Sequence, residues 1–381
     1  MWYNKNMTKL GIFGGTFDPV HNEHVKVAKI AIEKLGLDKL IIMPTFIPPH
    51  KNTAVTDGKI RLEMLKRCFD GIEKTEVSDY EITKGGTSYT YQTVEYFKQK
   101  YQCELYFLVG ADMLTNFKTW KNPDRILSAC TLVSVGRDGV FYGEENERKY
   151  FKENFNKDFV KLEYQGSDIS SSKVRVYSSL NLDIKEYVPQ KVYEYIENNQ
   201  LYSGDEYTEF LKKNLTEKRL IHTANVTLTA LKKAKELGLD SEKVRIASLL
   251  HDCAKYLNPL DFKHFKMPDG VPKPVEHAFL GAYVAEKILG VTDAEIIDAI
   301  RYHTSGKPEM STLSKLVFVA DMIEVGRSYD GVDYLRSLYD GDFEYCFRES
   351  LKEEYIHLIN KGQEIFDATR KAYEYYIGKN L

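Results

Sequence analysis

The chain has 381 residues, which exceeds what one hydrophobic core usually organises, so we expect two domains. Hydrophobic residues make up 43% of the chain and charged residues 29%, as in ordinary soluble globular proteins. The formal net charge of -3 excludes a global attraction to nucleic acid or to an anionic membrane, and we predict neither as a partner. Any recognition of phosphate must therefore be local.

The five cysteines are scattered along the chain and show no CxxC spacing. This pattern indicates reduced thiols and argues against both a disulfide framework and a zinc ribbon. The first residues, MWYNKNMTKLGIF, lack the apolar segment of a secretion signal, and no later run approaches membrane-spanning length. We therefore expect a cytoplasmic protein, and a homo-oligomer is compatible with the sequence.

Short apolar runs alternate with amphipathic stretches from Thr8 to about Tyr202. The runs KLGIF, KLIIMP, ELYFLVG and CTLVSVG are typical of buried strands, and helical patterns lie between them, for example over residues 23–35 and 90–100. This alternation predicts an α/β, Rossmann-like parallel sheet with helices on both faces. Ligands of such sheets bind at the carboxyl ends of the strands.

The pattern changes after Gly204, because nearly everything from Glu206 onward has a 3.6-residue periodicity. In VRIASLLHDCAKY, for instance, the apolar residues share one helical face. The turn residues and charges of LYSGDE separate a helix that ends near Asn198 from the helix that follows. We therefore predict an α/β domain over residues 1–203 and an all-α domain over residues 204–381.

The first strand runs into GGTFDPVHNEH, a string with the features of a phosphate-binding loop. Gly14 and Gly15 remove side chains where backbone N–H groups must approach a polyanion, and the next helix presents its unpaired N–H groups and positive dipole end. His21 and His24 are three residues apart near the helix start, so they face the same way. Both can donate to phosphate oxygens.

Four further blocks follow this string in order. The five blocks are GGTFDPVH at 14–21, PPHK at 48–51, TSYT at 87–90, GADM at 110–113 with Trp120, and DISSSKVR at 168–175. Together they resemble the nucleotidylyltransferases with an HxGH signature, and more closely the bacterial nicotinate mononucleotide adenylyltransferases. The resemblance covers roughly residues 8–202.

The resemblance implies transfer of AMP from ATP, accompanied by Mg2+, to nicotinate mononucleotide. It assigns catalytic roles at the triphosphate to His21, His24 and Arg175. It places Lys51 near the phosphates, has the serines of DISSSKVR cap the helix that carries Arg175, and makes Thr87, Tyr89 and Trp120 a nicotinate pocket. Trp120 as plain core and Asp112 as only a helix N-cap remain alternatives. The implied substrate-binding residues are Gly14, Gly15, Thr16, Phe17, Lys51, Thr87, Tyr89, Asp112, Trp120, Ser170, Ser171 and Ser172.

One residue departs from the signature. The glycine expected between the histidines is Glu23, which gives HNEH. A carboxylate there could oppose the phosphates of ATP by on the order of 1 kcal/mol if solvent screens it. Because a helix dipole favours an acid in the first turn, we expect Glu23 to point outward.

In the second half of the chain, histidines and aspartates occur within helical patterns in the order H…HD…H…H…D. Imidazoles and carboxylates suit a divalent metal. LLHDCAKY and RYHTSGKPEMSTLSKLVFVADMIEVGR resemble the HD phosphohydrolases, in the branch of symmetrical diadenosine tetraphosphate hydrolases, over about residues 205–340. The metal ligands implied by the resemblance are His222, His251, Asp252, His277, His303 and Asp321.

The resemblance also implies two metal ions bridged by Asp252, which is therefore counted as catalytic. Iron is the metal of the family, while manganese or cobalt would fit the same ligands. Lys255, Lys307 and Arg327 are candidates for binding a polyphosphate, or are solvated surface charges. Two alternatives stay open: the HD half cleaves another nucleotide phosphoester, or one half is a non-catalytic regulatory module.

Overall fold

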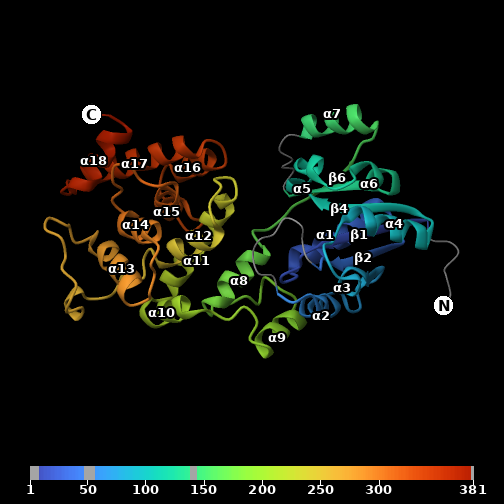
Figure 1. Ribbon diagram of the computed structural model, residues 1–381, viewed down its shortest axis with the longest axis horizontal. Helices are drawn as coiled ribbons and strands as arrows, with labels where there is room; N and C mark the ends of the chain where they lie inside the picture. Colours follow the sequence, from blue (N-terminus) through green and yellow to red (C-terminus); the bar gives the residue numbers. More distant parts are fainter. Residues whose placement is uncertain (1–7, 47–55, 138–143, 379–381) are drawn as a thin grey trace. The chain divides into compact units, whose positions relative to one another are not determined.

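The computed structural model describes residues 8–46, 56–137 and 144–378 (Figure 1). The chain divides into two compact units, one of residues 1–174 and 184–201 and one of residues 175–183 and 202–381. The second division lies at the predicted turn LYSGDE. The short segment 175–183, which the sequence assigned to the first domain, belongs to the second unit because Tyr177 there donates a buried hydrogen bond to Asn225 at 3.0 Å.

The first unit is built on a six-stranded sheet in the order β3-β2-β1-β4-β5-β6, with every neighbouring pair parallel. The predicted parallel α/β fold is confirmed, and the four predicted runs form β1, β2, β4 and β5. The short β3 and the largely polar β6 were not predicted. The strands are β1 (Lys9–Gly15), β2 (Lys39–Pro44), β3 (Thr75–Val77), β4 (Glu104–Gly110), β5 (Thr131–Arg137) and β6 (Val160–Tyr164).

The central strands are apolar on both faces because helices cover both. Phe107 and Val109 of β4 join a core with helices α4 and α6, while Leu108 between them points to the opposite side and is also buried. The chain order reverses between β1 and β4, so their carboxyl ends form a topological switch point. The helices of this unit are α1 (Asn22–Leu35), α2 (Gly58–Phe69), α3 (Tyr80–Lys84), α4 (Thr90–Tyr101), α5 (Ala111–Thr115), η1 (Phe117–Thr119), α6 (Pro123–Ala129), α7 (Glu144–Phe155) and α9 (Gln190–Asn198). Helix α8 (Ser171–Ser179) has residues in both units.

The second unit contains helices and no strand among its described residues, as the periodicity predicted (Figure 1). Most of its helices begin at a side chain that accepts the first free backbone N–H groups, for example Asp240 before α12 and Ser311 before α15. Within the described residues, no helix has the length and apolarity that crossing a membrane requires. The helices are α10 (Glu206–Asn214), α11 (Glu217–Ala234), α12 (Ser241–Leu250), η2 (Pro259–Asp261), α13 (Glu276–Lys287), α14 (Ala294–Tyr302), α15 (Thr312–Ile323), α16 (Val332–Tyr339), α17 (Phe343–Asn360) and α18 (Asp367–Tyr376).

Candidate functional sites

A cavity of about 530 Å³ lies at the switch point of the first unit. Gly14 and Gly15 at the end of β1 line it, and so do Gly110 and Ala111 at the end of β4. Both histidines of the predicted loop also line this cavity. The residues predicted to meet phosphate therefore gather where a parallel sheet binds its ligands.

Two glycines at the end of β1 and a buried arginine shape the loop that follows this strand. A Cβ at Gly15 would lie 3.0 Å from the ring of Phe17, so a side chain has little room there. Arg61 of α2 is 1% exposed, and its guanidinium donates to the backbone oxygens of Thr16 at 2.7 Å and of Phe46 at 3.1 Å. Sequence reasoning missed Arg61, because a lone arginine in an amphipathic helix carries no signal of its own.

His21 and His24 stack on each other, with ring centres 3.7 Å apart and planes 26° from parallel. The backbone N–H of His21 donates to Nδ1 of His24 at 3.2 Å. Because Nδ1 accepts, the proton of a neutral His24 ring sits on Nε2. His24 is thus oriented as a hydrogen-bond donor beside the glycine turn.

Glu23 does not point outward, so that expectation is wrong. Its side chain is 5% exposed and lines the same cavity. Oε1 accepts a hydrogen bond from the hydroxyl of Ser167 at 2.7 Å, whereas the buried Oε2 accepts none within the described part of the chain. Ser167, which follows β6, holds the carboxylate inside with this hydrogen bond. The bond outweighs the weak preference of an acidic side chain for the exposed side of the first helical turn.

The serines of DISSSKVR begin helix α8, as predicted. Oγ of Ser170 accepts from the N–H of Lys173 at 3.1 Å, and Ser170 also lines the cavity. The hydroxyl of Ser171 donates to the backbone oxygen of Pro19 at 2.9 Å, which ties the helix start to the glycine loop. Arg175 is half-buried on the same helix and is grouped with the second unit.

The three residues of the predicted nicotinate pocket come from two segments, one before α4 and one after η1. Tyr89 precedes α4, and the ammonium of Lys121, the residue after Trp120, lies 4.4 Å from the centre of its ring. Trp120 packs against Phe117, and its buried Nε1 donates to no acceptor among the described residues. Neither Thr87 nor the other two predicted pocket residues line the 530 Å³ cavity. Lys51 lies outside the described residues, as does the side chain of Asp112.

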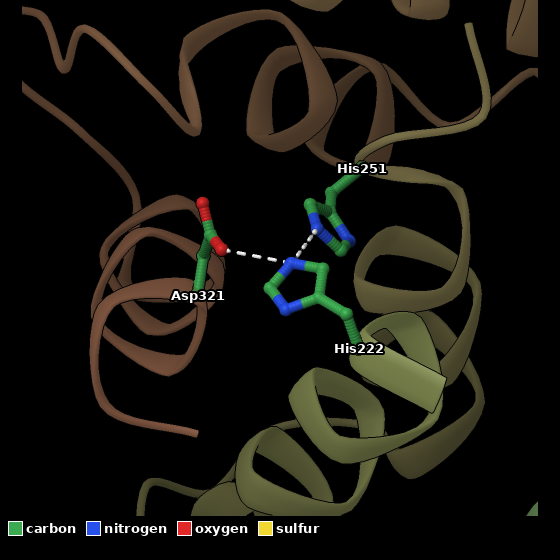
Figure 2. A group of neighbouring side chains, drawn as sticks. All are labelled: His222, His251 and Asp321. Carbon is green, nitrogen blue, oxygen red and sulfur yellow. Dashed lines mark hydrogen bonds and ion pairs between the residues drawn. The ribbon is translucent and has the colours of Figure 1, made fainter. Parts of the chain in front are cut away.

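In the second unit, His222 of α11, His251 after α12 and Asp321 of α15 point toward one another (Figure 2). Nε2 of His222 lies 3.1 Å from Oδ1 of Asp321 and 3.4 Å from Nε2 of His251. The ligand atoms of the three residues lie within 4.8 Å of one another. A single ion could be reached by all three.

Asp252 lies between this group and a second pair of histidines. Its Oδ2 is 3.8 Å from Nε2 of His222 and 3.6 Å from Nε2 of His251. Its Oδ1 is 3.0 Å from Nε2 of His277 and 3.6 Å from Nε2 of His303. The structure thus brings all six predicted ligands together, with one carboxylate oxygen facing each half of the cluster.

The donor set fits cations. Nδ1 of His251 lies 2.6 Å from the backbone oxygen of Ser248, and Nδ1 of His303 lies 2.7 Å from that of Ile300. Because a backbone oxygen only accepts, each Nδ1 carries the proton and each Nε2 aims a lone pair into the cluster. Lone pairs that face the buried carboxylate of Asp252 repel it unless a positive charge lies between them.

The environment sets the charges of these histidines. Burial lowers the pKa of His251 to about 3, and burial also lowers the pKa of His277. Both rings are therefore neutral near pH 7, which is the form that binds metal. For His222, burial opposes the charged form, but hydrogen bonds to Asp321 and Glu324 outweigh it and raise the pKa.

Two residues of the cluster were missed by sequence reasoning. Glu324 is 3% exposed, and its Oε1 lies 3.1 Å from Nδ1 of His222, the nitrogen that faces away from the cluster. Arg219 lies one helical turn before His222 and donates to Oδ2 of Asp252 at 2.7 Å. The only signal was spacing, since each stands three residues from a predicted ligand.

A cavity of about 700 Å³ opens beside the cluster and is lined by Asp252, Lys255 and Arg327, among others. Lys255 Nζ lies 3.1 Å from Nε2 of His277, and the guanidinium of Arg327 pairs with Asp321. These two predicted cations therefore stand at the cluster. Lys307 does not line the cavity and pairs with Asp298 at 2.5 Å.

Comparisons with known proteins divide the chain in the same way. Residues 12–176 match the cytidylyltransferase-like family, and residues 219–326 match the HD domain. A protein of Clostridium tetani named as a probable nicotinate-nucleotide adenylyltransferase is 40% identical over 199 residues, which are 51% of this chain and 100% of the relative.

A second relative spans both halves. A protein of Mycoplasma genitalium named as a probable nicotinate-nucleotide adenylyltransferase/Ap4A hydrolase is 32% identical over 329 residues, 84% of this chain and 89% of the relative. A crystal structure from Clostridium acetobutylicum, described as a predicted HD superfamily hydrolase involved in NAD metabolism, is 34% identical, with a TM-score of 0.42 over 46% of this chain and 97% of that one. The chain belongs to the family of two-domain proteins in which a nicotinate-nucleotide adenylyltransferase of the cytidylyltransferase-like fold precedes an HD domain.

Proposed function

We propose that the first unit transfers the AMP moiety of ATP to the 5′-phosphate of nicotinate mononucleotide, giving deamido-NAD and pyrophosphate. The observation that carries this proposal is the cavity at the ends of β1 and β4, lined by His21 and His24. The likeness to nicotinate-nucleotide adenylyltransferases over their full length supports it. Mg2+ would enter with the triphosphate.

Both reactants already carry phosphate, so the transfer needs alignment and charge stabilisation and no protein nucleophile. Backbone N–H groups of the glycine turn would meet the negative charge. At the start of α1, the N–H groups of Asn22 and His24 already donate to the backbone oxygens of Tyr187 and His21. His24 donates from Nε2, since its Nδ1 is held by the backbone of His21. The start of α8, capped by Ser170, adds a second helix N-terminus to the cavity wall.

We propose that the second unit hydrolyses diadenosine tetraphosphate symmetrically to two ADP with the help of two divalent metal ions, iron by resemblance and manganese or cobalt as alternatives. The observation that carries this proposal is the position of Asp252 between two pairs of histidines, His222 with His251 and His277 with His303. His222, His251 and Asp321 would hold one ion, His277 and His303 the other, and Asp252 both. Two such ions lower the pKa of a bound water and clamp the attacked phosphate.

The chain's own cations would bind the polyphosphate. Lys255 and Arg327 stand in the wall of the 700 Å³ cavity, and Arg219 lies there too, against Asp252. A guanidinium offers a planar fork that matches two phosphate oxygens, and an ammonium offers a point charge. Their joint position beside the cluster would orient a phosphate chain toward the ligands.

Product analysis on the intact chain tests both proposals. One reaction contains ATP and nicotinate mononucleotide, and the other contains diadenosine tetraphosphate with Fe(II) or Mn(II). We expect deamido-NAD in the first and only ADP in the second, whereas AMP plus ATP would refute symmetrical cleavage. Nucleoside 5′-monophosphates and a guanosine polyphosphate, assayed in parallel, decide whether the HD unit prefers another phosphoester.

A further inference from the structure

One wall of the 700 Å³ cavity comes from outside the HD domain. The HD match ends at residue 326, but helix α17 (Phe343–Asn360) also lines the cavity. It contributes residues 353, 354, 357 and 360, a spacing that places them on one helical face. Helix α17 therefore takes part in the site, and its side chains constrain what the cavity holds.

The two walls differ in charge. The wall beside the metal-ligand cluster carries Arg219, Lys255 and Arg327, which attract phosphate, together with the carboxylates of Asp252 and Asp321. Arg219 pairs with Asp252 and Arg327 with Asp321. The α17 wall carries Glu353 and Glu354, whose carboxylates repel it. A ligand that fits both walls has an anionic part and an uncharged part that offers hydrogen-bond donors.

The loop after α15 adds an aromatic face. The hydroxyl of Tyr329 donates to the backbone oxygen of Met322 at 3.1 Å, which anchors the far end of the side chain. The residue is 39% exposed and lines the cavity. A held ring that remains open to a cavity is a surface on which a planar base can stack.

The α17 face adds polar groups for the rest of a nucleoside. Asn360 and His357 are exposed side chains in the same wall. An amide pairs with the donor and acceptor that adenine presents on one edge, N6 and N7. The carboxylate of Glu353 or Glu354 can accept from ribose hydroxyls, a role that acidic residues have in nucleotide-binding folds.

We propose that Tyr329 and the α17 residues Glu353, Glu354, His357 and Asn360 form a nucleoside subsite of the HD unit. The base stacks on Tyr329, Asn360 reads its edge, and the ribose meets the glutamates. The phosphates then run toward Arg327 and the ligand cluster. This inference rests on the proposed function, because it assigns the adenosine end of the same dinucleotide.

Steady-state hydrolysis by the intact chain, with diadenosine tetraphosphate and with inorganic tripolyphosphate, tests the subsite. Tyr329→Ala should lower kcat/KM for the dinucleotide roughly 5- to 150-fold, mainly through KM, because base–aromatic stacking has that strength. Tyr329→Phe keeps the ring but loses the hydroxyl bond to Met322, so kcat/KM should fall less than in Tyr329→Ala. Tyr375→Ala removes an exposed tyrosine of α18 outside the cavity and is the matched control.

Activity on tripolyphosphate, or its absence, should be the same in all four proteins, since that substrate has no base. Asn360→Ala should reduce the preference for diadenosine over diuridine tetraphosphate. Wild-type kcat/KM for the dinucleotide in Tyr329→Ala would overturn the subsite while leaving the proposed function intact. A wild-type chain that does not cleave the dinucleotide would instead overturn the proposed function, and the subsite with it.

Discussion

Replacing Glu324 by glutamine would impair one half of the ligand cluster and leave the other half intact. One carboxylate oxygen of Glu324 faces Nδ1 of His222 at 3.1 Å, and the other accepts the backbone N–H of Gly326 at 2.6 Å. A glutamine can keep the Gly326 bond only with its carbonyl oxygen. Its NH2 group then faces Nδ1 of His222, which must accept, and the proton of that ring moves to Nε2.

A protonated Nε2 cannot bind a metal, so the change disables His222 without touching any ligand atom. Loss of such an outer partner typically weakens metal binding 10- to 100-fold, or about 1.4 to 2.7 kcal/mol. The site of His277 and His303 has no bond to Glu324 and should keep its ion. We therefore expect the metal content at limiting Mn(II) to fall from about two ions per chain to about one, with a parallel loss of hydrolysis.

The assay is elemental analysis after dialysis against graded Mn(II), combined with hydrolysis rates. Glu344→Gln is the matched control, because Glu344 pairs with Lys315 on the surface. Formation of deamido-NAD reports that the first unit is intact. Unchanged metal affinity in Glu324→Gln, or equal loss of both ions, would refute the assigned tautomer and the division of the cluster.

Four further predictions follow from the two sites. His21→Ala and Arg175→Ala should each lower deamido-NAD formation by about 10²- to 10⁴-fold and spare hydrolysis; near-normal transfer would mean that the triphosphate binds elsewhere. Nicotinate mononucleotide should be preferred to nicotinamide mononucleotide, because donors arranged for a carboxylate are left unsatisfied by an amide; equal kcat/KM for the two contradicts the pocket. Glu23→Gly should not reduce transfer. It should lower the free energy of unfolding, measured by denaturant titration, by roughly 1–3 kcal/mol, since it removes the bond to Ser167 and places glycine in a helix. A large drop in kcat would instead mean that Glu23 contributes to the reaction. In metal-free protein, His251 has a pKa of about 3 in the folded state and 6.5 in the unfolded state. As the pH falls, the unfolded chain binds this proton first, so the free energy of unfolding should fall from pH 6.5 toward pH 3, by up to roughly 5 kcal/mol. His251→Gln should flatten this pH dependence, and an unchanged slope would contradict the burial of a neutral ring.

The sequence alone was enough to predict the four inner strands of the sheet and to name the chemistry of the site residues. Apolar runs alternating with amphipathic stretches were enough to predict β1, β2, β4 and β5, because a strand buried on both faces must be apolar throughout. The short β3 and the polar β6 were not predicted, because edge strands bury less apolar surface and therefore have a weaker hydrophobic pattern in the sequence. The six metal-ligand candidates could be named because imidazoles and carboxylates stood in a family order.

Only the tertiary structure decided how these residues meet. Glu23 is buried because Ser167, distant in the sequence, supplies a donor. Glu324 orients His222 across 102 residues of chain. Helix α17 lines the 700 Å³ cavity, although no sequence motif predicted this. Hydrogen bonds and burial act between residues that folding brings together, whereas periodicity and motifs record what lies along the chain. The residues that orient each site from behind, such as Ser167 and Glu324, are therefore found only in the packed structure.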